Sequence, residues 1–112
     1  MILLQLDEMM RECLQNCTDC HYVCLRTAVS GDVVGKISAE DLKLLLNCAE
    51  MCRTSADFID TESAFHKKTC GLCSEICEAC AAMCERSNIE IMRQCAQTCR
   101  KCADSCRRMA QG

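Results

Sequence analysis

The sequence contains no proline and no tryptophan, and only three of its 112 residues are aromatic. β-Branched residues are few and apolar residues do not alternate with polar ones, so we expect no β-strands. No apolar run approaches the length of a membrane-spanning helix, and no membrane partner is expected. Thirteen basic and sixteen acidic residues are interspersed, giving a net charge of −3, so a nucleic-acid partner is not expected either.

A targeting signal is also missing from the start of the chain. The first eight residues have neither the basic segment of a secretory signal nor a pair of arginines. We therefore expect a cytoplasmic protein. The length suits one domain with a modest core, spanning residues 1–112.

Fifteen cysteines are present, a density typical of small secreted proteins stabilised by disulfides. Three observations argue against disulfides here. The number is odd, and no secretion signal is visible in the first residues. Most neighbouring cysteines are three or four residues apart, so a disulfide between them would close almost no loop and would constrain the unfolded chain very little. We therefore expect reduced thiols, as in the cytoplasm.

The densest cysteine stretch is Cys70–Cys84, where five cysteines follow one another at steps of three, four, three and four. Residues at these spacings lie on one face of an α-helix, here within an arc of about 80°. The same steps recur in three other segments. The residues predicted to line these faces are Cys13, Cys17, Cys20, Cys24, Cys48, Cys52, Cys70, Cys73, Cys77, Cys80, Cys84, Cys95, Cys99, Cys102 and Cys106.

Four helices are predicted, over residues 2–30, 38–60, 62–86 and 88–110. Ser38 is a candidate N-cap, and Ser87 with Glu90 forms a candidate capping box. Gly31 is a candidate C-terminal cap for the first helix. The connections are short and favour antiparallel neighbours, so the fold class is all-α, an antiparallel up-down-up-down four-helix bundle.

A core of thiols needs an explanation, because cysteine is small. Each replacement of a leucine by cysteine loses about 1 kcal/mol of apolar burial, taking roughly 0.8 kcal/mol per buried CH₂. A structural or interaction bundle with reduced core cysteines is therefore a costly design, though it stays open as an alternative. Redox Cys-x-x-Cys pairs normally lie at an exposed helix N-terminus, whereas these are in mid-helix, so we do not expect an enzyme.

Soft thiolates select Cu(I), Zn(II) and iron–sulfur clusters. Zinc sites usually use two separated cysteine pairs, and ferredoxin-type clusters use a spacing that Cys70–Cys80 does not have. Cu(I) accepts two thiolates about 4 Å apart, close to what cysteines at i and i+4 can reach, as in Cys73/Cys77 and Cys80/Cys84. The sequence therefore favours storage of many Cu(I) ions. A metallothionein-like buffer for zinc or another soft metal remains the alternative.

Weaker soft ligands are expected at one end of the bundle. With alternating helix directions, Met9, Met10, His66 and Met109 all fall where the first and fourth helices have their chain termini. Thioethers and imidazole suit loading and release, so these four are candidate uptake residues. Met92 is expected to close the opposite end, beside Leu45. Met83 is expected to face outward.

The cysteine segments Cys13–Cys24, Cys48/Cys52, Cys70–Cys84 and Cys95–Cys106 resemble those of the bacterial copper storage proteins, over nearly the whole chain. The resemblance implies a four-helix bundle that holds many Cu(I) ions through cysteine thiolates and usually assembles into a homotetramer. It also implies the cytosolic type, which lacks a twin-arginine signal. A protein that delivers copper or accepts it is a further expected partner.

Overall fold

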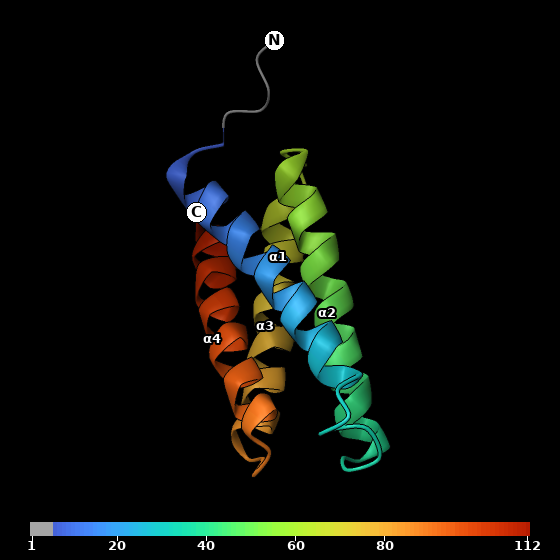
Figure 1. Cartoon of the computed structure of the whole chain (residues 1–112). Helices are drawn as coiled ribbons and strands as arrows, with labels where there is room; N and C mark the ends of the chain where they lie inside the picture. The colour runs from blue at the N-terminus through green and yellow to red at the C-terminus, as the bar shows by residue number, and fades with distance from the viewer. Residues whose placement is uncertain (1–5) are drawn as a thin grey trace.

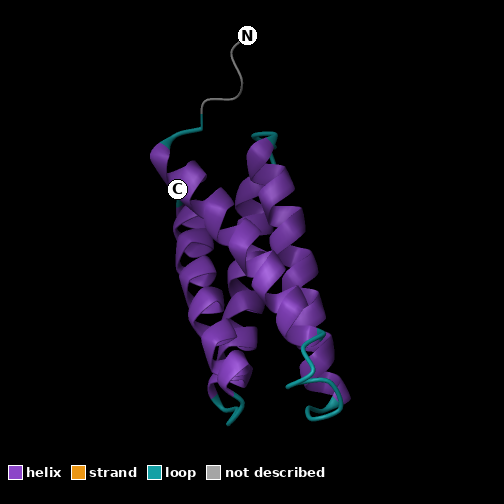
Figure 2. Ribbon diagram, viewed as in Figure 1, coloured by secondary structure: helices purple, strands orange, loops and turns teal. Residues whose placement is uncertain are grey.

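The structure is a computed structural model and describes residues 6–112. It contains helices α1 (Glu8–Ala28), α2 (Ala39–Asp60), α3 (His66–Glu85) and α4 (Glu90–Gln111), and the part of the chain it describes has no strand (Figures 1 and 2). The helices form an elongated bundle measuring 47 × 28 × 19 Å. No helix within residues 6–112 is both long enough and apolar enough to cross a membrane.

Each helix packs against two others. α1 packs along α2 and α4, and α3 packs along the same two helices. The diagonal pairs meet through core side chains, as Cys52 Sγ on α2 and Cys102 Sγ on α4 do at 3.8 Å. Chain neighbours run in opposite directions, which confirms the predicted antiparallel bundle (Figure 1). We call the end where α1 and α3 begin the His66 end, and the end where α2 and α4 begin the Leu45 end. The C-terminus lies at the His66 end, where α1 begins (Figure 1).

Helix α1 is shorter than the predicted 2–30. Residues 2–5 lie outside the described residues, and the helix begins at Glu8 because the Asp7 side chain accepts a hydrogen bond from the Met10 N–H, at 2.8 Å. It ends at Ala28. Gly31 does not have the left-handed conformation expected of a cap; the glycine with positive φ is Gly35, at 78°.

The predicted start of α2 is confirmed, since the Ser38 hydroxyl accepts from the Asp41 N–H at 3.1 Å. The predicted start of α3 at residue 62 is wrong. Residues 61–65 form a turn in which Glu62 has a φ of 50°, and the helix begins at His66.

The predicted capping box before α4 is not formed. The Ser87 hydroxyl accepts from the Ile89 N–H at 3.0 Å, and α4 begins at Glu90. The Glu90 carboxylate instead pairs with the Arg93 guanidinium, three residues further along the helix.

Candidate metal centre

All fifteen thiols lie between the four helices, and none of the side chains is exposed to solvent. None of them is in a disulfide. Neighbouring sulfurs approach as closely as 3.4 Å, the distance from Cys17 Sγ to Cys106 Sγ. The prediction that every cysteine faces the core is therefore confirmed, and the core is a column of reduced thiols.

Twelve of the thiols form groups whose sulfurs lie within 4.8 Å of one another. From the His66 end, the groups are Cys13/Cys70/Cys106, Cys17/Cys73/Cys102/Cys106, Cys20/Cys52/Cys77/Cys102 and Cys20/Cys24/Cys48/Cys99. Consecutive groups share Cys106, Cys102 and Cys20 in turn. The groups are therefore linked into one continuous path along the bundle axis.

The closest sulfur pairs join different helices. Cys52 and Cys77, on α2 and α3, are 3.5 Å apart, and Cys24 and Cys99, on α1 and α4, are 3.6 Å apart. The i, i+4 pairs that the sequence suggested are slightly wider. The Cys73–Cys77 distance is 3.8 Å, and other such pairs reach 4.0 Å. Spacing along one helix could not reveal the contacts between helices, since these depend on how the helices are set against one another.

Neighbouring thiols change one another's acidity. Hydrogen bonds from the Cys102 and Cys106 thiols lower the pKa of Cys17 to about 6. The Cys106 thiol also lowers the pKa of Cys70, but the Cys13 thiol and burial outweigh this effect and raise that pKa to about 11. The column therefore loses its first protons readily and its later ones with difficulty, because each thiolate depends on neighbours that are still protonated. A bound cation would replace those protons.

The four candidate uptake residues differ in exposure at the His66 end. Met9 is 45% exposed, Met10 and His66 are half-buried, and Met109 is buried. His66 lies four residues before Cys70 on α3, and its Nδ1–H donates to the Ser63 carbonyl at 2.8 Å. This hydrogen bond leaves Nε2 of the neutral imidazole as the nitrogen with a free lone pair.

The Leu45 end is closed by apolar side chains. Val33, Leu45 and Met92 are almost completely buried there, in agreement with the expectation for Met92. The expectation that Met83 faces outward is wrong, because Met83 is only 5% exposed. It lines a cavity of about 250 Å³ together with Met92 and residues of the two connections at this end.

Two buried hydroxyls belong to the thiol faces and were not predicted as site residues. Ser55, three residues after Cys52 on α2, has no exposed surface, and its Oγ lies 3.5 Å from Cys70 Sγ. Thr27, three residues after Cys24 on α1, is 1% exposed. The Cys24 thiol is the main cause of a lowered pKa at Cys95, and the Thr27 hydroxyl adds a smaller decrease. Their helical spacing from the last cysteine was the signal that could have identified them.

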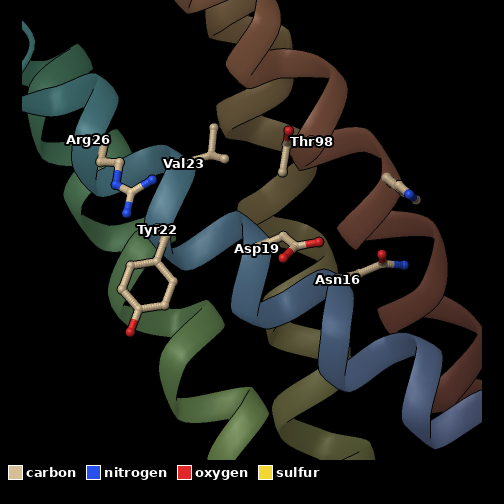
Figure 3. A pocket seen from close by; sticks show the side chains of 7 residues that line it. Asn16, Asp19, Tyr22, Val23, Arg26 and Thr98 are labelled. Carbon is tan, nitrogen blue, oxygen red and sulfur yellow. The ribbon is translucent and has the colours of Figure 1, made fainter.

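A cavity of about 390 Å³ lies on the outside of α1 and α4 (Figure 3). Tyr22, Arg26 and Asp19 line it from α1, and Thr98 and Lys101 from α4. No cysteine lines this cavity, so it is separate from the thiol column.

Residues 3–111 match the family model described as Csp, copper storage protein. The Nmul_A1745 protein of Nitrosospira multiformis has a similar solved structure, with 42% identity and a TM-score of 0.87 over 94% of this chain and 97% of that one. Cu(I)-bound copper storage protein BsCsp3 is 33% identical, with a TM-score of 0.62 over 92% of each chain. A cytosolic copper storage protein from Streptomyces lividans, 23% identical, has a TM-score of 0.81 over 94% of each chain, which shows the shared fold.

A curated relative is the cysteine-rich protein YhjQ of Bacillus subtilis strain 168, which is 34% identical over 65 residues. The match covers 58% of this chain and 56% of the relative, so it spans about half the length of that protein.

Proposed function

The chain belongs to the copper storage protein family, and from that premise we propose that it stores many Cu(I) ions on the cysteine thiolates of its core. The observation that carries the proposal is the burial of all fifteen thiols in the core, twelve of them in groups linked along the bundle axis. Thiolate is the ligand type that Cu(I) prefers, and no catalytic constellation is needed for storage. The protein's role is therefore to bind and release metal rather than to catalyse a reaction.

Charge balance supports a monovalent ion. A dozen thiolate anions could not remain in a dry helical core without compensating charge. Each Cu⁺ cancels the charge of one thiolate, so that one ion per cysteine leaves the filled column neutral. The capacity we propose is therefore on the order of the cysteine count.

The sharing of thiols between groups favours Cu(I) over zinc. A structural Zn²⁺ needs four ligands of its own in a tetrahedron. Here Cys20, Cys102 and Cys106 each belong to two groups, so independent tetrahedral sites cannot all be filled at once. Cu(I) with two or three ligands can instead share a bridging sulfur with the next ion. A zinc buffer remains the second candidate, since three of the groups contain four thiols.

Copper is proposed to enter and leave at the His66 end, by way of Met9, Met10, His66 and Met109. This end combines thioethers and an imidazole with partial exposure, so a Cu(I) ion can be captured before it reaches a buried thiolate. We further propose a cytoplasmic location, assembly into a homotetramer, and exchange with a copper-delivering or copper-accepting protein. These three proposals rest on the family.

The experiment that tests storage is an anaerobic titration of the fully reduced protein with Cu(I), in the presence of a competing Cu(I) chelator. We expect tight uptake of many equivalents, close to the number of cysteines. Saturation at one or two equivalents would contradict storage. A parallel titration with Zn²⁺ distinguishes the second candidate, which predicts that zinc binds tightly and resists displacement by Cu(I).

A further inference from the structure

The layer of the thiol column nearest the His66 end contains a serine oxygen beside its sulfurs. Ser55 continues the cysteine face of α2 three residues after Cys52, and it is completely buried. Its Oγ lies 3.5 Å from Cys70 Sγ. Ser55 therefore occupies the position on α2 where a further thiol of the column would lie.

The consequence is a smaller set of sulfurs at the His66 end. The group there holds only Cys13, Cys70 and Cys106, whereas the three groups further along the column hold four thiols each. A serine hydroxyl is a hard, neutral donor that neither suits Cu(I) nor cancels its charge. A Cu(I) ion in this layer therefore has fewer surrounding thiolates to bind it and to balance its charge than an ion deeper in the column.

The same layer is connected to the next one through a shared sulfur. Cys106 lies 3.6 Å from Cys13 in the outer group and 3.4 Å from Cys17 in the following group. An ion bound by the outer thiols can thus pass inward by exchanging ligands on Cys106, without leaving sulfur coordination. The outer layer lies one helical turn from His66, which is four residues before Cys70 on α3.

We propose that Ser55 makes the Cys13/Cys70/Cys106 group the exchange site of the store, where Cu(I) is bound weakly enough to be loaded and withdrawn. The proposal rests on the proposed copper storage. Serine in place of cysteine sets the affinity of this layer below that of the inner groups, so copper leaves the column from the His66 end first.

Thr27 provides an internal comparison. It is also a buried hydroxyl on a thiol face, but it lies at the Leu45 end, three residues after Cys24. Val33 and Leu45 close that end and have no exposed surface. A sulfur added at Thr27 would therefore strengthen Cu(I) binding in a layer from which copper does not exchange directly with solvent.

The test measures how fast a Cu(I) chelator withdraws copper anaerobically from the fully loaded protein. For the unmodified protein we expect a small fast fraction followed by a slow remainder. Ser55→Cys adds the missing sulfur and should slow the fast fraction by at least about tenfold, a typical effect of improving a metal's ligand environment. Ser55→Ala should keep the fast fraction, because it adds no sulfur.

Thr27→Cys is the matched control, since it adds one thiol to the other end of the column. It should leave the rate of the fast fraction unchanged. An unchanged fast fraction in Ser55→Cys would overturn the proposal, as would equal slowing by Thr27→Cys or by Ser55→Ala. Failure of the unmodified protein to take up more than one or two Cu(I) would instead contradict storage itself, so the two failures are distinguishable. Thiol counts and helix content by circular dichroism check that each variant is reduced and folded.

Discussion

The two ends of the bundle are closed differently, although both are capped by buried side chains. At the Leu45 end, Val33 and Leu45 have no exposed surface and offer no ligand atoms. At the His66 end, half-buried Met10 and His66 lie next to the thiol column. Methionines occur at both ends, since Met83 and Met92 are buried at the Leu45 end, so methionine alone does not indicate the direction of copper movement. The proposed direction therefore rests on the imidazole and the partial exposure at the His66 end.

The largest expected effect is a loss of stability when the closed Leu45 end is opened by a substitution. Leu45→Ala leaves a cavity in a fully buried position and should destabilise the metal-free protein by about 2–5 kcal/mol. Urea unfolding of the reduced protein measures the loss. Leu46→Ala on the same helix is the control, because Leu46 is 41% exposed and its removal should cost less than about 0.5 kcal/mol. Equal losses in the two variants would show that Leu45 does not close the bundle.

Removing the soft ligands of the His66 end should slow copper capture without lowering capacity. The variant combines Met9→Leu, Met10→Leu, Met109→Leu and His66→Gln, which keep side-chain volume roughly constant. We expect initial Cu(I) uptake to be slower by about tenfold, the effect of a barrier raised by roughly 1.4 kcal/mol. Stopped-flow mixing with a Cu(I)–chelator complex measures the rate.

Met92→Leu at the Leu45 end is the control for that experiment, and it should leave the uptake rate unchanged. A loss of capacity in the His66-end variant would mean that these residues store copper rather than pass it on. An unchanged rate would remove them from the uptake route.

The pH dependence of copper release tests a difference between Cys70 in the outer layer and Cys17 in the next one. The raised pKa of Cys70, about 11, keeps this thiol protonated at neutral pH, so copper binding there must displace its proton. Affinity in the outer layer should therefore fall by about tenfold for each unit of decreasing pH. Cys17, whose pKa is lowered to about 6, is already a thiolate above that pH and releases no such proton.

Chelator withdrawal measured between roughly pH 6.5 and 8.5, an interval between those two pKa values, tests the difference. Cys70→Ser should reduce the steepness of the pH dependence, whereas Cys17→Ser should leave it unchanged. An equal reduction by the two variants would argue against distinct proton chemistry at Cys70.

The smallest expected effects come from one glycine at each end. Gly71 lies in α3 near the His66 end, and an added Cβ would meet Ala110 Cβ at an ordinary contact distance of 3.6 Å. Gly71→Ala should therefore stabilise the protein by about 0.5–1 kcal/mol through helix propensity. Gly35 has a φ of 78° in the connection at the Leu45 end, so Gly35→Ala should destabilise it by about 1–2 kcal/mol. Thermal unfolding checks the opposite signs, and shifts of the same sign would refute this backbone argument.

The bundle and the burial of every cysteine could be predicted from the sequence, because steps of three and four fix which residues share a helical face. The start of α3 could not, since the turn at Glu62 interrupts a segment that otherwise suits a helix. Met83 was misplaced for a different reason. Met83 lies on a side of α3 that faces away from the thiols. Its side chain is nevertheless covered by residues of the connections at the Leu45 end.

The thiol groups themselves depend on contacts between helices. The Cys17–Cys106 pair joins residues far apart in the chain, and only the register between α1 and α4 brings their sulfurs to 3.4 Å. Ser55 follows Cys52 by three residues and so shares its helical face, but the sequence does not show that Cys70 lies beside it.

The measurement that tests the central claim most directly is copper K-edge X-ray absorption of the fully loaded protein. If Cu(I) ions fill the column and share its thiolates, the spectrum should show a sulfur-dominated ligand shell and a second shell of neighbouring copper atoms. A shell of nitrogen and oxygen ligands, or copper without copper neighbours at full loading, would contradict a shared thiolate store.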